Sequence, residues 1–365
     1  MLNVLHIVSN KIYGGPEQYA HDLLASLKAE GHYVEIVCKN YANVVDHFRK
    51  IDIPVSLLPL KGMTDIDSAM RFARMVKRGK NIIHVHSMRD AMIALLAKRL
   101  SENKNNRVVL TCHNVEHPRL SFLHKKIYKE LDKIIFPSEL SYNEFVAMRP
   151  KVDRGQLVMI HDSVLPNVTP QAPAVDIRQT YGIGAGKALI MFHGRVSPEK
   201  GVEVLLKALT KIDRNAFHLA IVGSGQPKYV SLLKSFIVAN NLVGNVTFLG
   251  FKDNLLPLIE QCDFGVLPSV WRETFGIANL EYMMAGKAHI ATNNGAQSEY
   301  LSDGKTAILV DPGNHASLAA QIKRLIDDGE LRRSLGKAAK EDYDSKLEYS
   351  HFYRQINELY HSLFK

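Results

Sequence analysis

Glu273 and Glu281 are eight residues apart, and two carboxylates at this spacing could both contact one bound ligand. They flank Phe275-Gly276-Ile277, which follows an apolar stretch at 264–267. A helix that begins near Gly276 would point its first N–H groups, and its positive dipole end, at an anion. The glutamates would then accept hydrogen bonds from hydroxyl groups beside that anion. The pattern indicates a nucleotide-sugar site, although a surface helix with one capping and one solvated glutamate would look the same.

Two cations follow a second strand-like stretch. Residues 189–192 lead into His193-Gly194-Arg195, and Lys200 comes five residues after the arginine, just before a predicted helix at 202–209. Gly194 would allow close approach of a ligand to the backbone. The forked guanidinium of Arg195 and the ammonium of Lys200 are suited to a diphosphate. Solvated surface charges are the alternative explanation for such a pair.

The composition of the chain bounds its class. A length of 365 residues exceeds what one ordinary core serves, so two domains are expected. No apolar run approaches the length of a membrane span, and the first residues look like a buried strand without a leader. The three cysteines lie far apart with no paired spacing, so we expect neither a disulfide scaffold nor a zinc site. They are Cys38, Cys112 and Cys262. Reduced cysteines of this kind are typical of the cytoplasm, which is the expected location.

Positive charge gathers in the first half of the chain. Residues 1–150 hold 22 Lys and Arg against 15 Asp and Glu, within a net charge of +9 for the whole chain. Cations and apolar residues interleave near 119–133, as on a helix at an anionic membrane surface. An ordinary amphipathic helix packed on its own domain fits equally well. Nucleic acid is not expected, since no stacking aromatics or reading motif appear.

Strand-length apolar runs alternate with helical stretches through both halves, which is typical of parallel α/β layers. The predicted fold class is α/β with two doubly wound, Rossmann-like domains that face a cleft. We expect an N-terminal domain over 1–168, a C-terminal domain over 169–345, and a tail helix over 346–365 that closes the second domain or crosses back to the first. The polar stretch 167–174 is the expected linker.

Taken together, Gly14-Gly15, Gly194-Arg195 with Lys200-Gly201, and the Glu273/Glu281 pair resemble the retaining glycosyltransferases of family 4, also called glycosyltransferase group 1. The resemblance extends from the first strand to about residue 336. It implies the GT-B fold, with the donor nucleotide on the C-terminal domain and the acceptor on the N-terminal domain. It also implies an enzyme, a hexosyltransferase of class EC 2.4.

The resemblance assigns roles to individual residues. Arg195 and Lys200 look like ligands of the departing diphosphate, Glu273 like the acid that touches the donor sugar, and His113 like the histidine that contacts this sugar from the N-terminal domain. Glu281 resembles the acceptor for the ribose hydroxyls. The remaining expected donor contacts are Gly14, Gly15, Gly194, Gly225, Phe251, Thr274, Phe275, Gly276 and Ile277. His86, near the end of a strand it shares with His84, is expected to line the pocket.

Two other motifs look like cofactor-binding signatures but do not predict a cofactor. Gly223-Ser224-Gly225 follows a strand, but Lys228 stands where a dinucleotide fingerprint has its third glycine, so NAD is not expected. Asp65-Ile66-Asp67 looks like a metal-binding acidic pair, yet its place before a helix favours an N-cap. We therefore expect neither a metal nor another cofactor.

The resemblance thus implies a retaining transfer of a hexose from a UDP- or GDP-linked donor to a glycan or lipid-linked acceptor. The basic N-terminal half favours polysaccharide or lipopolysaccharide biosynthesis at the inner face of a membrane. A nucleotide-sugar 2-epimerase on the same scaffold is an alternative. A sugar-nucleotide-binding subunit without catalysis is another.

Overall fold

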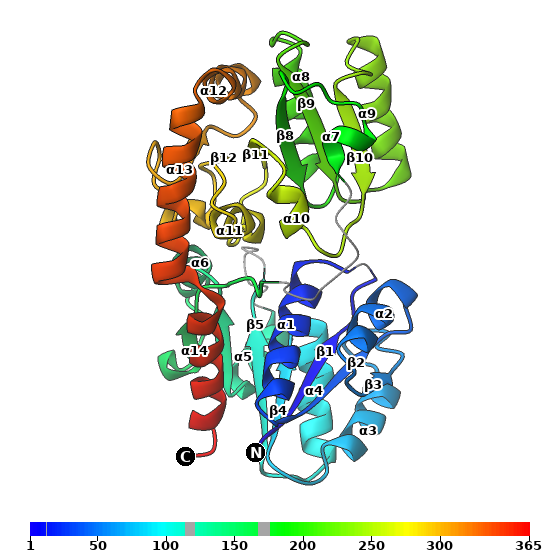
Figure 1. Cartoon of the computed structure of the whole chain (residues 1–365). Coiled ribbons are helices and arrows are strands. Elements are labelled where there is room, and N and C mark those ends of the chain that lie inside the picture. Colours follow the sequence, from blue (N-terminus) through cyan, green and yellow to red (C-terminus); the bar gives the residue numbers. More distant parts are fainter. Residues whose placement is uncertain (12, 114–120, 167–175) are drawn as a thin grey trace. The chain divides into compact units, whose positions relative to one another are not determined.

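The chain forms two compact units in a computed structural model, which describes residues 1–11, 13–113, 121–166 and 176–365 (Figure 1). The first unit comprises Met1–Asp162 together with Ser350–Lys365, and the second comprises Ser163–Tyr349. The predicted linker at 167–174 lies outside the described residues. Each unit contains one parallel sheet with helices on its faces, which is the predicted α/β architecture.

The sheet of the first unit has seven strands in the order β3-β2-β1-β4-β5-β6-β7. Its central strands are almost wholly buried, as expected for a parallel sheet covered on both faces. The strands are β1 (Asn3–Val8), β2 (Tyr33–Cys38), β3 (Val55–Leu57), β4 (Asn81–Val85), β5 (Asn106–Thr111), β6 (Lys133–Phe136) and β7 (Leu157–Met159).

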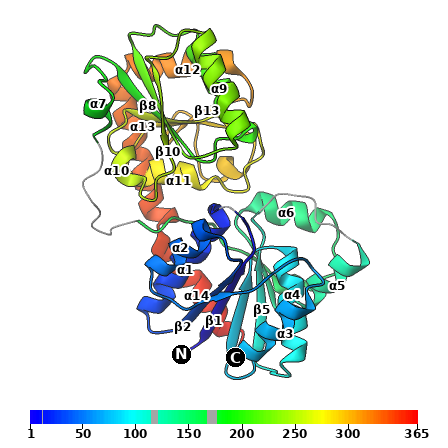
Figure 2. The ribbon, with the colours of Figure 1, turned by 90° about the vertical axis from the view of Figure 1, so that its right-hand side faces the viewer.

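Helices cover both faces of this sheet, with α1 and α2 on one face and α3 and α4 on the other (Figure 2). Residues Leu5, Ile7, Ile83 and Val85 pack with α3 and α4. Because side chains alternate along a strand, the residues between them point to the opposite face. The helices are α1 (Gly15–Ala29), α2 (Ala42–Lys50), α3 (Ile66–Met75), α4 (Met88–Leu100), α5 (Phe122–Glu130), α6 (Glu139–Ala147) and α14 (Tyr349–Ser362).

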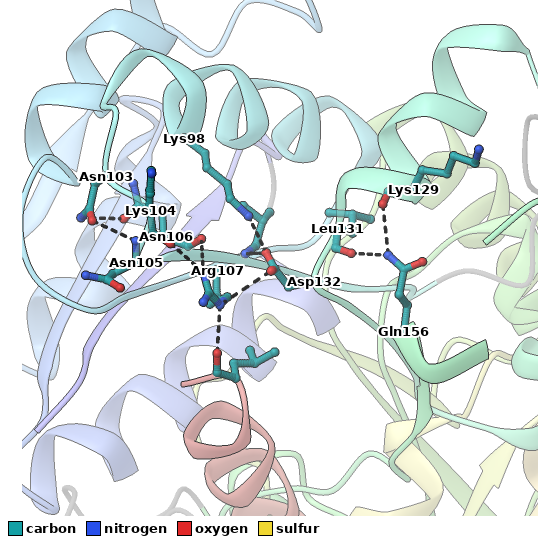
Figure 3. A network of polar contacts seen from close by, with 12 residues as sticks. Lys98, Asn103, Lys104, Asn105, Asn106, Arg107, Lys129, Leu131, Asp132 and Gln156 are labelled. Atoms are coloured by element: carbon teal, nitrogen blue, oxygen red, sulfur yellow. Dashed lines mark hydrogen bonds and ion pairs between the residues drawn. The ribbon is translucent and has the colours of Figure 1, made fainter. Parts of the chain in front are cut away.

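The C-terminal helix α14 belongs to the first unit, and its end is tied down by the polar network of Figure 3. Arg107 Nε donates to the carbonyl of Leu363 at 2.9 Å and lies 3.8 Å from the Asp132 carboxylate. Asp132 also accepts from Lys98 Nζ at 2.8 Å and from the Val108 backbone at 2.7 Å. The network joins the starts of two sheet strands to the last residues of the chain.

The second unit has six parallel strands in the order β10-β9-β8-β11-β12-β13. They are β8 (Ala188–His193), β9 (Phe217–Val222), β10 (Val246–Gly250), β11 (Phe264–Leu267), β12 (His289–Thr292) and β13 (Ile308–Val310). Ile190 and Phe192 pack on α8 and α12, while Leu189 and Met191 pack on the face of α7, α10 and α11. Both faces of the central strand β8 are therefore covered.

The helices of this unit include the predicted helix at 202–209, which the structure forms as α8 with these bounds. They are α7 (Ile177–Thr180), α8 (Val202–Leu209), α9 (Pro227–Ala239), α10 (Leu256–Ile259), α11 (Ile277–Met284), α12 (His315–Asp327) and α13 (Gly329–Asp342). At Asp65 the predicted N-cap is also present, because its side chain accepts from the Ser68 N–H at the start of α3.

Candidate functional site

The carboxyl edge of the second sheet is built by loops that pack backbone against backbone. A Cβ atom on Gly223, which follows β9, would lie 1.9 Å from the carbonyl oxygen of Gly194, which follows β8. A Cβ on Gly225 would lie 2.0 Å from the carbonyl oxygen of Val196. The Val196 N–H donates to the Ser224 carbonyl at 2.8 Å. Glycine at these positions is what allows the two loops to meet.

The loop after β8 also meets the loop after β11. Gly201 has φ +70° and approaches Pro268 so closely that a Cβ would lie 1.9 Å from its carbonyl oxygen. The Val270 N–H donates to the Glu199 carbonyl at 2.9 Å. This packing places the short 3₁₀ turn Pro198–Lys200 directly beside the segment that carries Glu273.

Lys200 and Glu273, both predicted as site residues, form a close ion pair at this edge. Lys200 Nζ lies 2.5 Å from Glu273 Oε1, and the Ser269 hydroxyl donates to the same oxygen at 2.5 Å. Both charged side chains are mostly buried, at 26% and 14% exposure. Because solvent screens this pair less than a surface pair, the attraction between the two charges is stronger. The carboxylate is thus fixed by a cation and a hydroxyl.

Arg195 lies on the same loop and is exposed. The pKa of the neighbouring Glu199 is lowered, first by a hydrogen bond from the Ser197 side chain and also by the positive charges of Arg195 and Lys200. Both predicted cations therefore act on one small region next to β8. Such a field would attract an anion from solvent.

The start of α11 completes the edge. Gly276 caps the helix with φ +89°, and a Cβ there would lie 2.8 Å from Asn279 Nδ2. Thr274 and Phe275 are buried, and Tyr300 donates its hydroxyl proton to the Phe275 carbonyl at 2.6 Å. The Asn279 N–H donates to the Gly276 carbonyl at 2.9 Å, whereas the amides of Ile277 and Ala278 stand at the helix start, where no preceding turn supplies a carbonyl. These contacts fix the direction in which the helix start points.

Glu281 is the fifth residue of α11, so it lies one turn inside the helix, as the sequence indicates. Its carboxylate contacts His193 Nε2 at 2.6 Å, and His193 is buried. His193 was not among the predicted site residues, although it stands directly before Gly194-Arg195 in the sequence. The signal that could have identified it is this position at the carboxyl end of β8.

The structure brings the predicted donor contacts of the second unit to one edge of its sheet, with Phe251 at the far end of that edge, next to the loop after β9. Phe251 follows β10, the outermost strand, and is 49% exposed. Strands β9 and β8 lie between β10 and β11 in the sheet. Gly225 lies between these regions, after β9.

In the first unit, Gly14 and Gly15 form the start of α1. Gly14 is the N-cap, and its N–H donates to Glu17 Oε2 at 3.1 Å, while Glu17 Oε1 accepts from Asn10 Nδ2 at 2.7 Å. Burial raises the pKa of Glu17 to about 7. A buried carboxyl thus stands directly under the glycine loop, a feature the sequence did not reveal.

The two predicted histidines of the first unit touch each other. His86 Nδ1 lies 2.9 Å from His113 Nε2, at the carboxyl ends of β4 and β5. Burial lowers the pKa of His113 to about 3 and that of His86 well below its usual value. Both rings are therefore neutral near pH 7, and they offer hydrogen bonds rather than charge.

Within the described residues, no group of three or more His, Cys, Asp or Glu side chains is arranged to hold a metal ion. Over the same residues, none of the helices combines the length and apolarity that a membrane crossing requires.

Comparison with known structures defines the fold. The Anabaena protein HepE, solved in complex with UDP-glucose, superposes with a TM-score of 0.85 over 99% of both chains at 20% identity. A glycosyltransferase from Rickettsia africae gives 0.86 over 100% of this chain and 98% of that one at 22% identity. Both matches cover the two units together, and the class is the GT-B fold of two Rossmann-like domains.

Sequence comparison gives the family. Residues 13–164 match Glycosyltransferase Family 4 and residues 175–342 match Glycosyl transferases group 1. The N-acetyl-alpha-D-glucosaminyl L-malate synthase of Bacillus anthracis is 24% identical over 96% of this chain and 95% of its own. The chain belongs to the group 1, family 4 glycosyltransferases, enzymes of class EC 2.4 that use nucleotide-sugar donors.

Proposed function

We propose that the protein transfers a hexose, with retention at the anomeric carbon, from a UDP-linked donor to a glycan or lipid-linked acceptor hydroxyl. The observation that carries this proposal is the convergence of Arg195, Lys200, Glu273 and the start of α11 at one sheet edge. Two cations and a helix start suit a diphosphate, and fixed carboxylates suit the hydroxyls beside it. The HepE complex with UDP-glucose favours UDP over GDP.

In this proposal the chemistry takes place between the donor and the acceptor. The bond from the anomeric carbon to the diphosphate oxygen breaks, and the bond to the acceptor oxygen forms on the same face. The acceptor proton passes to the leaving phosphate. Arg195, Lys200 and the first amides of α11 stabilise the negative charge that grows on the diphosphate. Glu273 binds a donor sugar hydroxyl and Glu281 binds the ribose.

The remaining predicted contacts extend the donor site. Gly194, Gly225, Thr274, Phe275, Gly276 and Ile277 present backbone to the donor, and Phe251 frames the base. From the first unit, His113 is assigned to the donor sugar, the Gly14-Gly15 loop to the phosphates, and His86 to the lining of the pocket. No metal or other cofactor takes part in the proposed reaction.

The acceptor side of the proposal rests on α5. Phe122 is 86% exposed and Leu123 37%, while Ile127 and Tyr128 of the same helix pack into the first core. The exposed cations Lys125, Lys126 and Lys129 share this helix. Exposed apolar side chains among lysines fit an anionic bilayer surface, so we assign a peripheral site on the cytoplasmic face of a membrane. A lipopolysaccharide N-acetylglucosaminyltransferase of Salmonella typhimurium is 25% identical over 70% of this chain.

A thermal-shift screen of UDP- and GDP-sugars, followed by detection of nucleotide release, tests the donor assignment. A donor at 100 times its dissociation constant should stabilise the protein by about 2.7 kcal/mol. A shift with GDP-sugars alone would reject the UDP assignment, and no shift with any UDP- or GDP-sugar would reject the whole proposal. Product analysis should show an α-linkage formed from an α-linked donor.

The rival functions give different outcomes in the same assay. A 2-epimerase would convert the donor into its epimer without any acceptor, whereas the transferase should release nucleotide only when an acceptor is added. A binding subunit would give the thermal shift but no turnover over a broad acceptor panel. For the membrane contact, Phe122→Ser should release the protein from vesicles that contain anionic phosphatidylglycerol, while Leu232→Ser on α9, also an exposed leucine, should not.

A further inference from the structure

Four histidines of the first unit share one face of its sheet. His6 of β1 stands beside His84 of β4 in the strand register, and His86 and His113 follow at the carboxyl ends of β4 and β5. All lie on the face opposite α3 and α4, because their strand neighbours pack on those helices. His6 and His84 are fully buried and His86 nearly so. His113 stands at the predicted donor site, and the other three extend inward from it.

Three of the histidines contact one another directly, and the hydroxyl of Tyr360 links the fourth, His84, to His6. His113 Nε2 lies 2.9 Å from His86 Nδ1, and His86 Nε2 lies 3.0 Å from His6 Nδ1. His6 Nε2 then lies 3.5 Å from the hydroxyl of Tyr360 on α14, the longest of these links.

The series of hydrogen bonds continues beyond the Tyr360 hydroxyl. Tyr360 contacts His84 Nδ1 at 2.5 Å, and His84 Nε2 contacts the Thr111 hydroxyl at 2.7 Å. Thr111 in turn donates to the hydroxyl of Tyr19 at 3.4 Å. Each inner imidazole thus uses both of its nitrogens within the chain.

The proton order in the chain is determined by its inner end. A neutral imidazole has one N–H and one lone pair, and a hydroxyl has one proton. With the Thr111 proton on Tyr19, His84 must donate to Thr111 and Tyr360 must donate to His84. By the same rule His6 donates to Tyr360, His86 to His6, and His113 Nε2 to His86. His113 Nδ1 then carries a lone pair, and it has no protein partner among the described residues.

This series of hydrogen bonds determines which atom carries each proton, but it does not conduct protons. In the order just described the donors point inward, so a proton taken up at His113 Nδ1 would end as a second proton on the Tyr19 hydroxyl, which is a very weak base. Transfer in the opposite direction would require Thr111 or Tyr19 to give up a proton. Burial raises the pKa of the Tyr19 hydroxyl above its usual value, and a threonine hydroxyl is a still weaker acid. A second proton on any inner ring would set two donors against each other, so the rings stay neutral.

We infer that Tyr360, His84, His6 and His86 are positioning residues that hold His113 as an uncharged hydrogen-bond acceptor facing the ligand. This inference rests on the proposed function, in which His113 contacts the donor sugar. An acceptor nitrogen without charge selects a sugar hydroxyl, because a carboxylate or phosphate oxygen offers it no proton. Tyr360 of the C-terminal helix α14 thus determines, through these hydrogen bonds, which nitrogen of His113 carries the proton.

Nitrogen-15 NMR of selectively histidine-labelled protein, without any ligand, measures the tautomer of His113 directly. The His113 signals are assigned by their loss in His113→Gln. The wild type should show His113 as the Nε2–H tautomer, unchanged between pH 6 and 8. Tyr360→Phe leaves the His6 N–H without an acceptor, so the order from His6 to His113 should reverse and the tautomer ratio should shift about tenfold or more towards Nδ1–H.

Thr111→Val provides a second, nearly isosteric variant, which removes the acceptor of the His84 N–H and should give the same reversal. Tyr353→Phe is the matched control, because Tyr353 lies on the same helix and interacts with Glu30 instead. A tautomer mixture or Nδ1–H in the wild type overturns the inference, as does an unchanged tautomer in Tyr360→Phe or in Thr111→Val. These results do not depend on turnover, so failure of the proposed transferase activity is recognised separately, by the donor screen.

Discussion

At the carboxyl edges of the two sheets, the predicted site side chains are of opposite kinds. In the second unit, charged groups meet at short distance, as with Lys200 and Glu273. In the first unit, the corresponding edge holds neutral imidazoles that are buried and hydrogen-bonded to one another. Charges suit the binding of a charged diphosphate, whereas neutral rings can hold a sugar hydroxyl at lower desolvation cost. The same sheet architecture therefore supports two different recognition chemistries.

Removing a charge from the second edge should have the largest effect. Arg195→Ala should reduce kcat about 10²- to 10³-fold, because one preorganised donor to the leaving diphosphate is lost. Lys207→Ala, at an exposed cation of α8 that pairs with Glu203, is the control and should leave kcat unchanged. The measurement is steady-state nucleotide release with saturating donor and acceptor. Wild-type turnover in Arg195→Ala would show that Arg195 does not bind the leaving diphosphate.

The packing between the loops at the charged edge can be disrupted by a substitution that changes no charged residue. Gly223→Ala would place a Cβ against the Gly194 carbonyl at φ +137°, and should lower the free energy of unfolding by about 2 kcal/mol or more. Gly244→Ala is the matched control, because a Cβ there meets no atom within 4 Å. Urea unfolding measures both variants, and equal stability would show that the two loops can separate at little cost.

Loss of one carboxylate should affect nucleotide binding more modestly. Glu281→Gln keeps the shape but removes the charge beside His193, so the Kd for UDP should rise roughly tenfold. Glu203→Gln on α8 should bind UDP like the wild type. Isothermal titration calorimetry distinguishes the two, and an unchanged Kd in Glu281→Gln would place the ribose elsewhere.

The neutral edge of the first unit should appear as a small pH effect on stability. The folded pKa of His113 is about 3, below the value of about 6.5 for an unfolded histidine. The unfolded chain therefore takes up the proton first as the pH falls. The contribution of His113 is complete above pH 6.5 and decreases below it, by at most about 1.4 kcal/mol per pH unit.

Urea unfolding at pH 7 and pH 5.5 measures this effect. The free energy of unfolding should fall less between these values in His113→Asn than in the wild type. An identical decrease in both proteins would mean that His113 is already protonated in the folded state at pH 5.5.

Local features of the fold were predictable from the sequence. The helix at 202–209 and the depth of Glu281 in α11 depend on apolar period and on glycine at the helix start, which are both visible in a short window. The N-cap at Asp65 is equally local. The alternation of strand-length apolar runs with helical stretches predicted the two α/β domains, and family resemblance then supplied the GT-B fold and the EC class.

The partners of the site residues could not be predicted in this way. His193 and Glu281 are 88 residues apart, and Lys200 and Glu273 are 73 apart. His6 and Tyr360 are separated by 354 residues. Such pairs arise from the order of strands in a sheet and from the path of the last helix. The burial that shifts the pKa of Glu17 likewise depends on packing and leaves no local pattern.

The path of the chain has a consequence for biosynthesis. The second unit is one continuous segment, Ser163–Tyr349, whereas the first needs both Met1–Asp162 and Ser350–Lys365. A ribosome therefore releases all of the second unit before the first has its final helix. Until then Tyr19 lacks Phe352, and His84 lacks the Tyr360 hydroxyl. The domain that is translated first is the one that matures last.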